Sequence, residues 1–264
     1  MKFIRLATIA ALSTTILAGG ATAAFAQEAR EVTTDGQIEF RPSGEEDGEL
    51  EVVPPVDHPE VEIEIEIPET TGPLSIVKAP TMNFGSQVIS NQDQSYNMVA
   101  EMQPLKETGE LIPYISFAQV QDSRGSNAGW DLQVSLSEFR SNTQNNILTG
   151  AQLEFVDSYI DYRADNQDNA PEAHAAGLEV LPGEGGRSVM TASEGKGALV
   201  SSVVWGDQAD LDAQFADETK EVVENAAIQL FIPGTTAKDA TTYTSTLTWE
   251  LTNTPGENGP GDNS

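Results

Sequence analysis

The sequence predicts an all-β fold, an antiparallel β-sandwich or barrel-like domain preceded by an acidic spacer rich in Pro and Gly. From Gly72 onward, short segments of alternating apolar and polar residues are separated by Gly, Asn, Asp and Pro, which is typical of antiparallel sandwiches and barrels. Residues 27–71 are rich in Glu, Pro and Gly, a composition that buries little apolar surface, and we interpret them as a mobile spacer. The chain has no Cys, so the core of the roughly 185 residues after the spacer must stabilise the fold without disulfides.

Two segments show the alternation most clearly. In residues 130–137 every second side chain, beginning with Trp130, is apolar and the others are polar. In residues 243–252 the same alternation places Trp249 on the apolar face and Glu250 on the polar face. A period of two predicts a half-buried strand in each segment. Further strands are expected over Leu74–Lys78, Ile115–Val120, Ala151–Val156, Ala198–Trp205 and Ala227–Ile232, and a short helix over Ala209–Phe215.

One part of the spacer does not fit a mobile segment. Residues Val61–Ile67 alternate strictly between aliphatic residues and Glu, which predicts a strand with one apolar and one acidic face. The acids would discourage pairing with another chain, so we expect an edge strand.

The N-terminus has the three parts of a secretory signal peptide. Lys2 and Arg5 precede an apolar run over residues 6–17, and Ala24-Phe25-Ala26 follows. The run is too short to span a bilayer as a helix, and the Ala-x-Ala pattern predicts cleavage after Ala26. The expected organisation is a signal peptide over 1–26, the spacer over 27–71, the β-domain over 72–255 and a disordered tail over 256–264.

Two Trp-x-Leu triplets carry a resemblance to a known family. They are Trp130-Asp131-Leu132 and Trp249-Glu250-Leu251, the second close to the end of the sequence. The residues around them strengthen the match: Gly72-Pro73-Leu74-Ser75-Ile76, Asn83-Phe84-Gly85, Val120-Gln121-Asp122-Ser123-Arg124-Gly125, Gly150-Ala151 and Tyr243-Thr244-Ser245-Thr246-Leu247. With these motifs, residues 72–255 resemble the WxL cell-wall-binding domain. The motif Gly36-Gln37-Ile38-Glu39-Phe40 and the acidic spacer resemble the front of the small WxL proteins.

The resemblance implies a secreted surface protein of low-GC Gram-positive bacteria that attaches to peptidoglycan without a covalent link. It also implies assembly with other WxL proteins and with a membrane-anchored partner. The sequence is consistent with this mode of attachment, because residues 255–264 do not form a sortase signal and no Cys offers a lipoprotein anchor. No segment after the signal peptide is expected to insert directly into a membrane.

The net charge limits the partners. Apart from Lys2 and Arg5, the chain carries 11 Lys and Arg against 42 Asp and Glu, a formal charge of −31. Such a charge repels anions over a screening length of about 8 Å at physiological ionic strength. This argues against nucleic acid and anionic lipid as partners, and against direct contact with teichoic acid phosphates unless divalent cations intervene.

The six triplet residues, Trp130, Asp131, Leu132, Trp249, Glu250 and Leu251, are the candidate wall-binding motif. The two indoles lie on the apolar faces of their strands, so periodicity favours core packing over direct glycan contact. The ligand would then meet the polar faces of the two strands, around Asp131, Gln133, Thr246, Thr248 and Glu250. Trp205 closes an apolar segment at a Gly206-Asp207 turn. An indole at a sheet rim there could stack on a sugar, and core packing is an equal alternative.

No catalytic residue, cofactor or metal site is expected. His58 lies in the Pro-rich spacer and His174 in a polar loop, so no Ser-His-Asp or zinc arrangement is indicated. The loop Asp165–Asn169 offers oxygen ligands without the spacing of a known calcium loop. The leading hypothesis is a non-enzymatic module that binds peptidoglycan. The alternatives are a wall glycan hydrolase and an adhesin or structural subunit held on the surface only through partner proteins.

Overall fold

The computed structural model describes residues 37–42, 52–63 and 70–253. By its internal contacts the chain divides into two units, Met1–Glu39 and Phe40–Ser264. Of the first unit only Gln37–Glu39 are described, and they form neither helix nor strand. The predicted signal peptide and the predicted tail lie outside the described residues.

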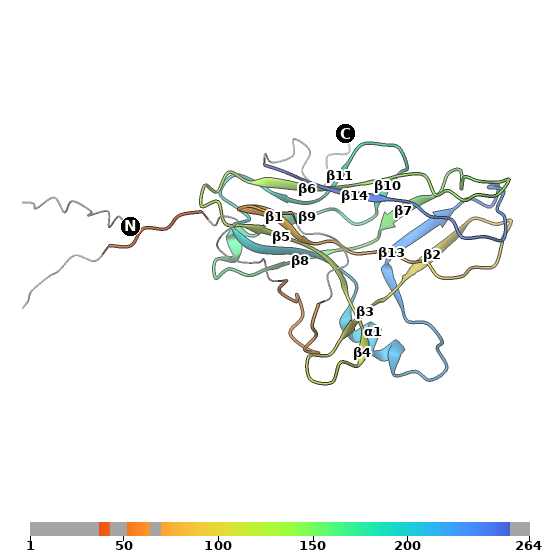
Figure 1. The fold of residues 1–264 in the computed structure, drawn as a ribbon, viewed down its shortest axis with the longest axis horizontal. Coiled ribbons are helices and arrows are strands. Elements are labelled where there is room, and N and C mark those ends of the chain that lie inside the picture. The colour runs from red at the N-terminus through yellow and green to blue at the C-terminus, as the bar shows by residue number, and fades with distance from the viewer. Residues whose placement is uncertain (1–36, 43–51, 64–69, 254–264) are drawn as a thin grey trace, which may run out of the picture. The chain divides into compact units, whose positions relative to one another are not determined.

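In the described residues of the second unit, nearly all the regular secondary structure is β-strand (Figure 1). The strands are β1 (Leu74–Lys78), β2 (Gln94–Val99), β3 (Glu101–Pro104), β4 (Leu111–Tyr114), β5 (Ser116–Asp122), β6 (Trp130–Leu136), β7 (Gln152–Phe155), β8 (Tyr159–Tyr162), β9 (Glu172–Ala173), β10 (Leu178–Val180), β11 (Arg187–Ala192), β12 (Leu199–Trp205), β13 (Glu224–Ile232) and β14 (Leu247–Thr252). The helices are a 3-10 turn over Gln167–Asn169 and α1 (Gln208–Phe215).

These strands form three four-stranded sheets and a hairpin, and every strand pair is antiparallel. The sheet orders are β1-β5-β12-β8, β10-β7-β13-β2 and β14-β6-β11-β9, and β3 pairs with β4. Figure 1 shows β6, β11 and β14 in one layer, β1, β5 and β8 in the layer facing it, and β3, β4 and α1 on the far side of the second layer. The predicted all-β, antiparallel sandwich is confirmed.

Two hydrophobic cores explain why the central strands are buried on both faces. Val203 and Trp205 of β12 face the main core between the sheets, whereas Val204 faces a smaller core formed with Leu211 of α1. In β5, Phe117 and Ala118 divide between the two cores in the same way. A strand with two buried faces does not alternate between apolar and polar residues. The sequence of β12, LVSSVVW, accordingly shows no alternation, and Ser201 and Ser202 are buried with the apolar residues.

Residues 52–63, within the predicted spacer, pack on the smaller core. The Val53 N–H donates to Gln119 Oε1 (2.9 Å), and Gln119 Nε2 donates to the Val53 carbonyl (2.7 Å). The Tyr114 hydroxyl donates to the Val56 carbonyl (2.6 Å) and accepts from its N–H (3.1 Å). Burial raises the pKa of Tyr114 to about 12, so the hydroxyl remains a donor. These contacts correct the interpretation of residues 52–63 as mobile, while the predicted domain limits stay a prediction.

The predicted edge strand over Val61–Ile67 is described only in part. Val61 is buried and forms an isolated antiparallel bridge with Leu105, and the Glu62 N–H donates to the Pro104 carbonyl. Residues 64–67 lie outside the described residues. The described end of this segment thus lies beside the β3–β4 hairpin.

Each predicted strand of the domain is present, with limits that differ by up to four residues, and the predicted helix is α1. Asp207 caps this helix, because its side chain accepts a hydrogen bond from the Ala209 N–H (2.8 Å). In the described part of the chain, no helix is long and apolar enough to cross a membrane.

Candidate functional site

The first Trp-x-Leu triplet lies in a central strand of its sheet. It opens β6, which runs between β14 and β11. Trp130 is 0% exposed, and its Nε1 donates to the Gly197 carbonyl (3.0 Å). A Cβ at Gly197, whose φ is +74°, would lie 2.4 Å from the Ala192 Cβ and 2.7 Å from Trp130 Nε1. Only glycine allows this approach of backbone and indole.

Asp131 differs from the sequence-based expectation, which placed it on an outward polar face. It is 0% exposed. Its carboxylate accepts hydrogen bonds from Thr191 Oγ1 (2.6 Å), Ser188 Oγ (2.7 Å) and Gln133 Nε2 (2.6 Å). The expectation of an exposed Asp131 is therefore wrong. The physical reason is that β6 is a central strand of its sheet, where the neighbouring strand β11 places the hydroxyls of Ser188 and Thr191 against the Asp131 carboxylate.

The second triplet lies on the edge strand β14. Trp249 and Leu251 are half-buried against the main core, and Glu250 is exposed on the opposite face. The Trp249 ring centroid is 6.2 Å from that of Trp205, with an interplanar angle of 51°. This strand therefore has the half-buried character that the alternation predicts.

Trp205 is not at a sheet rim. It is 0% exposed and lies in an aromatic cluster with Phe155, 4.9 Å between ring centroids, and with Trp249. The Asn225 side chain approaches the turn that follows and donates from Nδ2 to the Trp205 carbonyl (3.0 Å). A sugar cannot stack on an enclosed indole, so the expectation of glycan stacking at Trp205 is wrong and the alternative of a core tryptophan is right.

His174, expected in a polar loop, belongs to the same cluster. Its ring is stacked near Trp205 at 6.2 Å and 24°. Nδ1 lies 2.7 Å from the Ala175 carbonyl and Nε2 lies 2.9 Å from Trp205 Nε1. The indole N–H can only donate, so Nε2 accepts and the proton of the neutral ring is on Nδ1. Burial lowers the pKa of His174, which keeps the ring in this neutral form.

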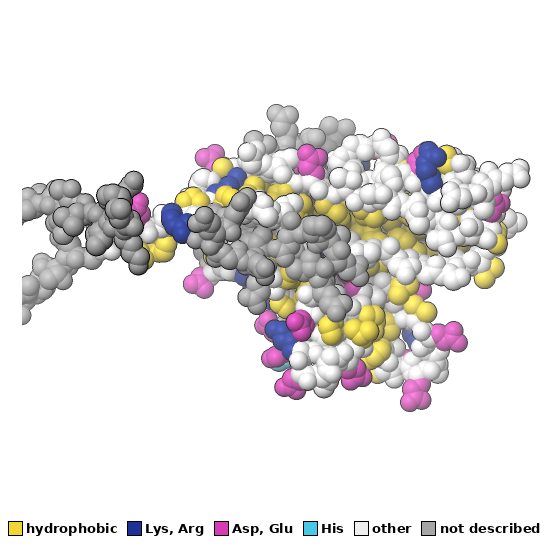
Figure 2. Space-filling view, in the orientation of Figure 1, with side chains coloured by type: hydrophobic (Ala, Val, Ile, Leu, Met, Phe, Trp, Pro, Cys, Tyr) yellow, Lys and Arg dark blue, Asp and Glu magenta, His cyan; other side chains and the backbone are white. Residues whose placement is uncertain are grey.

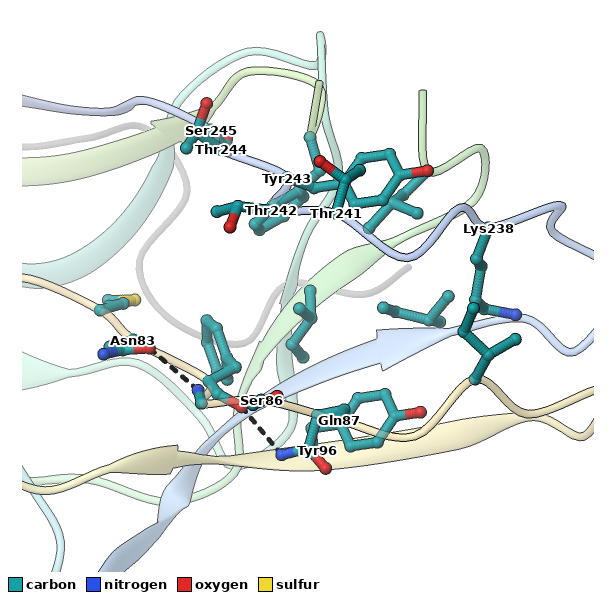
Figure 3. A pocket seen from close by; sticks show the side chains of 18 of the residues that line it. Asn83, Ser86, Gln87, Tyr96, Lys238, Thr241, Thr242, Tyr243, Thr244 and Ser245 are labelled. Atoms are coloured by element: carbon teal, nitrogen blue, oxygen red, sulfur yellow. Dashed lines mark hydrogen bonds between the residues drawn. The ribbon is translucent and has the colours of Figure 1, made fainter. Parts of the chain in front are cut away.

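An open groove of about 860 Å³ lies between two segments far apart in the sequence, residues 82–89 and 238–247. Figure 3 shows the two segments on opposite walls, with Tyr96 of β2 on the same side as Ser86 and Gln87. Leu153, Leu230 and Ile232 of the main core form part of its floor. In Figure 2 a band of hydrophobic side chains crosses this face of the molecule, and Asp and Glu lie mostly around its margins.

The two charged residues that line the groove are both engaged by the protein. Lys238 Nζ donates to the carbonyls of Ser90 (3.0 Å), Thr236 (3.0 Å) and Pro233 (3.2 Å). Asp239 accepts from the N–H (2.9 Å) and the Nδ2 (2.7 Å) of Asn145, and these bonds lower the pKa of Asp239.

Tyr243, which also lines the groove, ties the same wall to the neighbouring loop. Its hydroxyl donates to the Asn145 carbonyl (2.6 Å) and accepts from the Asp239 N–H (3.0 Å). These hydrogen bonds hold residues 238–245 in place. The exposed side chains of this wall that remain for a ligand include the neutral Thr241, Thr242 and Thr244.

A second, smaller depression of about 630 Å³ is lined by four acids, Asp157, Asp207, Asp210 and Glu224. Within the described residues no group of three or more His, Cys, Asp or Glu is arranged to hold a metal ion. The described loop Asp165–Asn169 contains the 3-10 turn, in which Asn166 Oδ1 accepts from the Asp168 N–H (3.2 Å).

A comparison with protein-family models matches residues 27–255 to the family described as WxL domain surface cell wall-binding. The chain belongs to the WxL family. No curated protein and no solved structure matches the chain significantly. Membership of this family associates the protein with the cell surface and the cell wall.

The structure separates the residues that identify the WxL domain from those accessible to a ligand. Core packing of Trp130, Leu132 and the half-buried Trp249 is confirmed. Of the six triplet residues Glu250 alone is exposed, and the role of the triplets as a wall-binding motif stays a prediction.

Sequence reasoning missed the groove, although two of its segments, Asn83-Phe84-Gly85 and the residues from Tyr243 to Leu247, are among the motifs of the family resemblance. The signal was present, but nothing in the sequence indicated that these segments face each other.

Proposed function

We propose that this protein is a non-enzymatic surface module that binds peptidoglycan and holds itself on the Gram-positive wall without a covalent link. The observation that carries the proposal is the open groove of about 860 Å³ on a domain of a cell-wall-binding family. Its volume falls in the range of about 300–1,000 Å³ usual for ligand sites. Its apolar floor and hydroxyl-bearing walls match the mixed character of a sugar polymer.

Charge favours peptidoglycan over the anionic polymers of the wall. A formal charge of −31 beyond the basic N-terminal residues repels teichoic acid phosphates wherever salt does not screen the interaction. Purified protein beginning at Gln27, with no partner present, is therefore expected to co-sediment with peptidoglycan stripped of teichoic acid. Binding that requires teichoic acid in the absence of divalent cations would contradict the proposal.

Two further assays address the mode of attachment and the lack of enzymatic activity. A strong chaotrope or low pH should release the protein from intact cells, whereas retention until a muralytic enzyme is added would indicate a covalent link. Incubation with peptidoglycan should release no new reducing ends. Accumulation of reducing ends would instead favour the glycan hydrolase.

We propose, second, that the protein assembles with other WxL proteins and with a membrane-anchored partner. The supporting observation is that β14 and β2 are edge strands of their sheets, and an edge strand can pair with a strand of another chain. If sedimentation with stripped peptidoglycan occurs only when such a partner is added, the protein is a subunit held on the wall by its partner.

A further inference from the structure

We propose that the groove between residues 82–89 and 238–247 binds an uncharged glycan strand, with Tyr96 and the threonines of residues 241–244 as its main contacts. This inference rests on the proposed function, because it names the part of the wall polymer and the surface of the protein that meet. The glycan backbone of peptidoglycan fits this chemistry, since its lactyl carboxyl groups are uncharged where they are amide-linked to the stem peptides.

The argument from charge comes first. The chain has 42 Asp and Glu, yet the groove is lined by one carboxylate and one ammonium, Asp239 and Lys238. Lys238 has used three N–H donors on backbone carbonyls, and Asp239 is bound by Asn145. Neither is free to pair with a charged ligand, and a buried charge on a ligand without a partner is costly. The groove therefore suits a neutral occupant.

The argument from shape and polarity follows. A sugar ring has an apolar C–H face and a polar rim. Tyr96 is half-buried on one wall, where its ring can receive such a face, and its hydroxyl makes no hydrogen bond within the described residues. The exposed Thr241, Thr242 and Thr244 on the opposite wall (Figure 3) offer donors and acceptors to sugar hydroxyls. Aromatic faces and neutral hydroxyls together are the chemistry that recognises neutral carbohydrate.

Charge substitutions at Thr242 test the inference most directly. The probe is a soluble N-acetylglucosamine hexasaccharide, titrated calorimetrically into the full mature chain. A neutral ligand predicts that Thr242→Lys and Thr242→Glu both weaken binding, each by about tenfold, because either charge must be desolvated. An anionic ligand predicts opposite effects, tighter with Lys and weaker with Glu, and this result would overturn the inference.

Matched controls separate the groove from the rest of the surface. Thr235 is exposed in the same connection but does not line the groove, so Thr235→Lys and Thr235→Glu should bind as the wild type does. Tyr96→Phe should weaken binding about fivefold, the equivalent of one neutral hydrogen bond. Tyr159→Phe, at an exposed tyrosine of β8 away from the groove, should have no effect. Thermal melts of each preparation verify folding.

Sedimentation of the same proteins with stripped peptidoglycan distinguishes failure of the inference from failure of the proposed function. If the wild type sediments but does not bind the hexasaccharide, the protein binds the cell wall through another surface and the groove assignment is wrong. The same conclusion follows if the groove variants bind the hexasaccharide like the wild type. If the wild type binds the hexasaccharide in the groove but does not sediment, the inference holds and wall attachment requires a partner.

Discussion

The two Trp-x-Leu triplets have the same sequence pattern and different surroundings. Trp130-Asp131-Leu132 lies in β6, between two neighbouring strands, and all three residues are buried. Trp249-Glu250-Leu251 lies in the edge strand β14 and keeps an exposed acidic residue. The two strands are themselves partners, with Trp249 opposite Val134 and Leu251 opposite Leu132. A short motif thus identifies the domain at two places, while the position of each strand in the sheet decides what its residues do.

The largest expected difference between the triplets is at the tryptophans. Trp130→Ala should lower the free energy of unfolding by roughly 3–5 kcal/mol, because it removes a fully enclosed indole and its hydrogen bond to Gly197. Trp249→Ala should cost roughly half as much, since its side chain is half-buried on an edge strand. Urea unfolding measures both values. Equal losses would indicate that β14 is covered in solution. Trp130→Ala protein that melts like the wild type but no longer binds wall would make the indole a direct contact.

Two glycine substitutions extend the comparison, because the indole of the first triplet donates a hydrogen bond to the Gly197 carbonyl. Gly195 and Gly197 both have positive φ, +87° and +74°, but a Cβ meets nothing within 4 Å at Gly195 and crowds Ala192 and Trp130 at Gly197. Gly195→Ala should cost about 1 kcal/mol through backbone conformation alone. Gly197→Ala should cost a further 1–3 kcal/mol or so through overpacking. The fluorescence of Trp130 should change only in the second variant.

The acidic residues of the two triplets should differ as well. Asp131→Ala leaves the buried donor of Thr191 and the half-buried donors of Ser188 and Gln133 without their acceptor and should cost about 2–3 kcal/mol. Glu250→Ala, on the exposed face of β14, should change stability by no more than about 0.5 kcal/mol. Chemical unfolding of the two variants in parallel provides the measurement. An Asp131→Ala protein as stable as Glu250→Ala would contradict the enclosed geometry.

The smallest expected effect is a pH dependence of stability that arises at His174. This residue belongs to the aromatic cluster that includes Trp249 of the second triplet. Burial lowers the pKa of His174 from its ordinary value of 6.5, so the unfolded chain binds the proton more readily than the folded one. Titration of His174 therefore leaves the free energy of unfolding unreduced above about pH 6.5. It lowers the free energy of unfolding as the pH falls below that value towards the folded-state pKa. Protonation of Nε2 would also replace the acceptor of the Trp205 N–H with a second donor.

Thermal melts between pH 7.5 and 5 measure this effect. His174→Gln keeps an acceptor for the indole and should flatten the dependence relative to the wild type. His58→Gln is the matched control, because His58 is exposed and its replacement should leave the dependence unchanged. An identical acid sensitivity in the His174→Gln protein would assign the effect to the carboxylates instead.

Periodicity predicted some strands well and others not at all, for a physical reason. The segments with one buried face, such as β14, keep a strict period of two. In β11, by contrast, Val189, Met190, Thr191 and Ala192 are all buried and the register shifts between Ser188 and Met190, so alternation is lost. In β2, polar residues such as Gln94 and Asn97 weaken the pattern further. Burial on both faces and a bulge cannot be inferred from one strand's own residues.

The sequence by itself determined the β-class, the strands with one solvent-facing side, the helix after Asp207 and the family, because these depend on local alternation, capping and motif identity. Tertiary structure decided the rest. Asp131 is buried because β11 supplies hydroxyls beside it, Trp205 is enclosed because Phe155, His174 and Trp249 converge on it, and residues 52–63 are held because Gln119 and Tyr114 bind their backbone. The groove exists only where residues 82–89 and 238–247 meet. Each of these depends on which distant segments the sheets bring together, and that pairing is set by the packing of the whole chain.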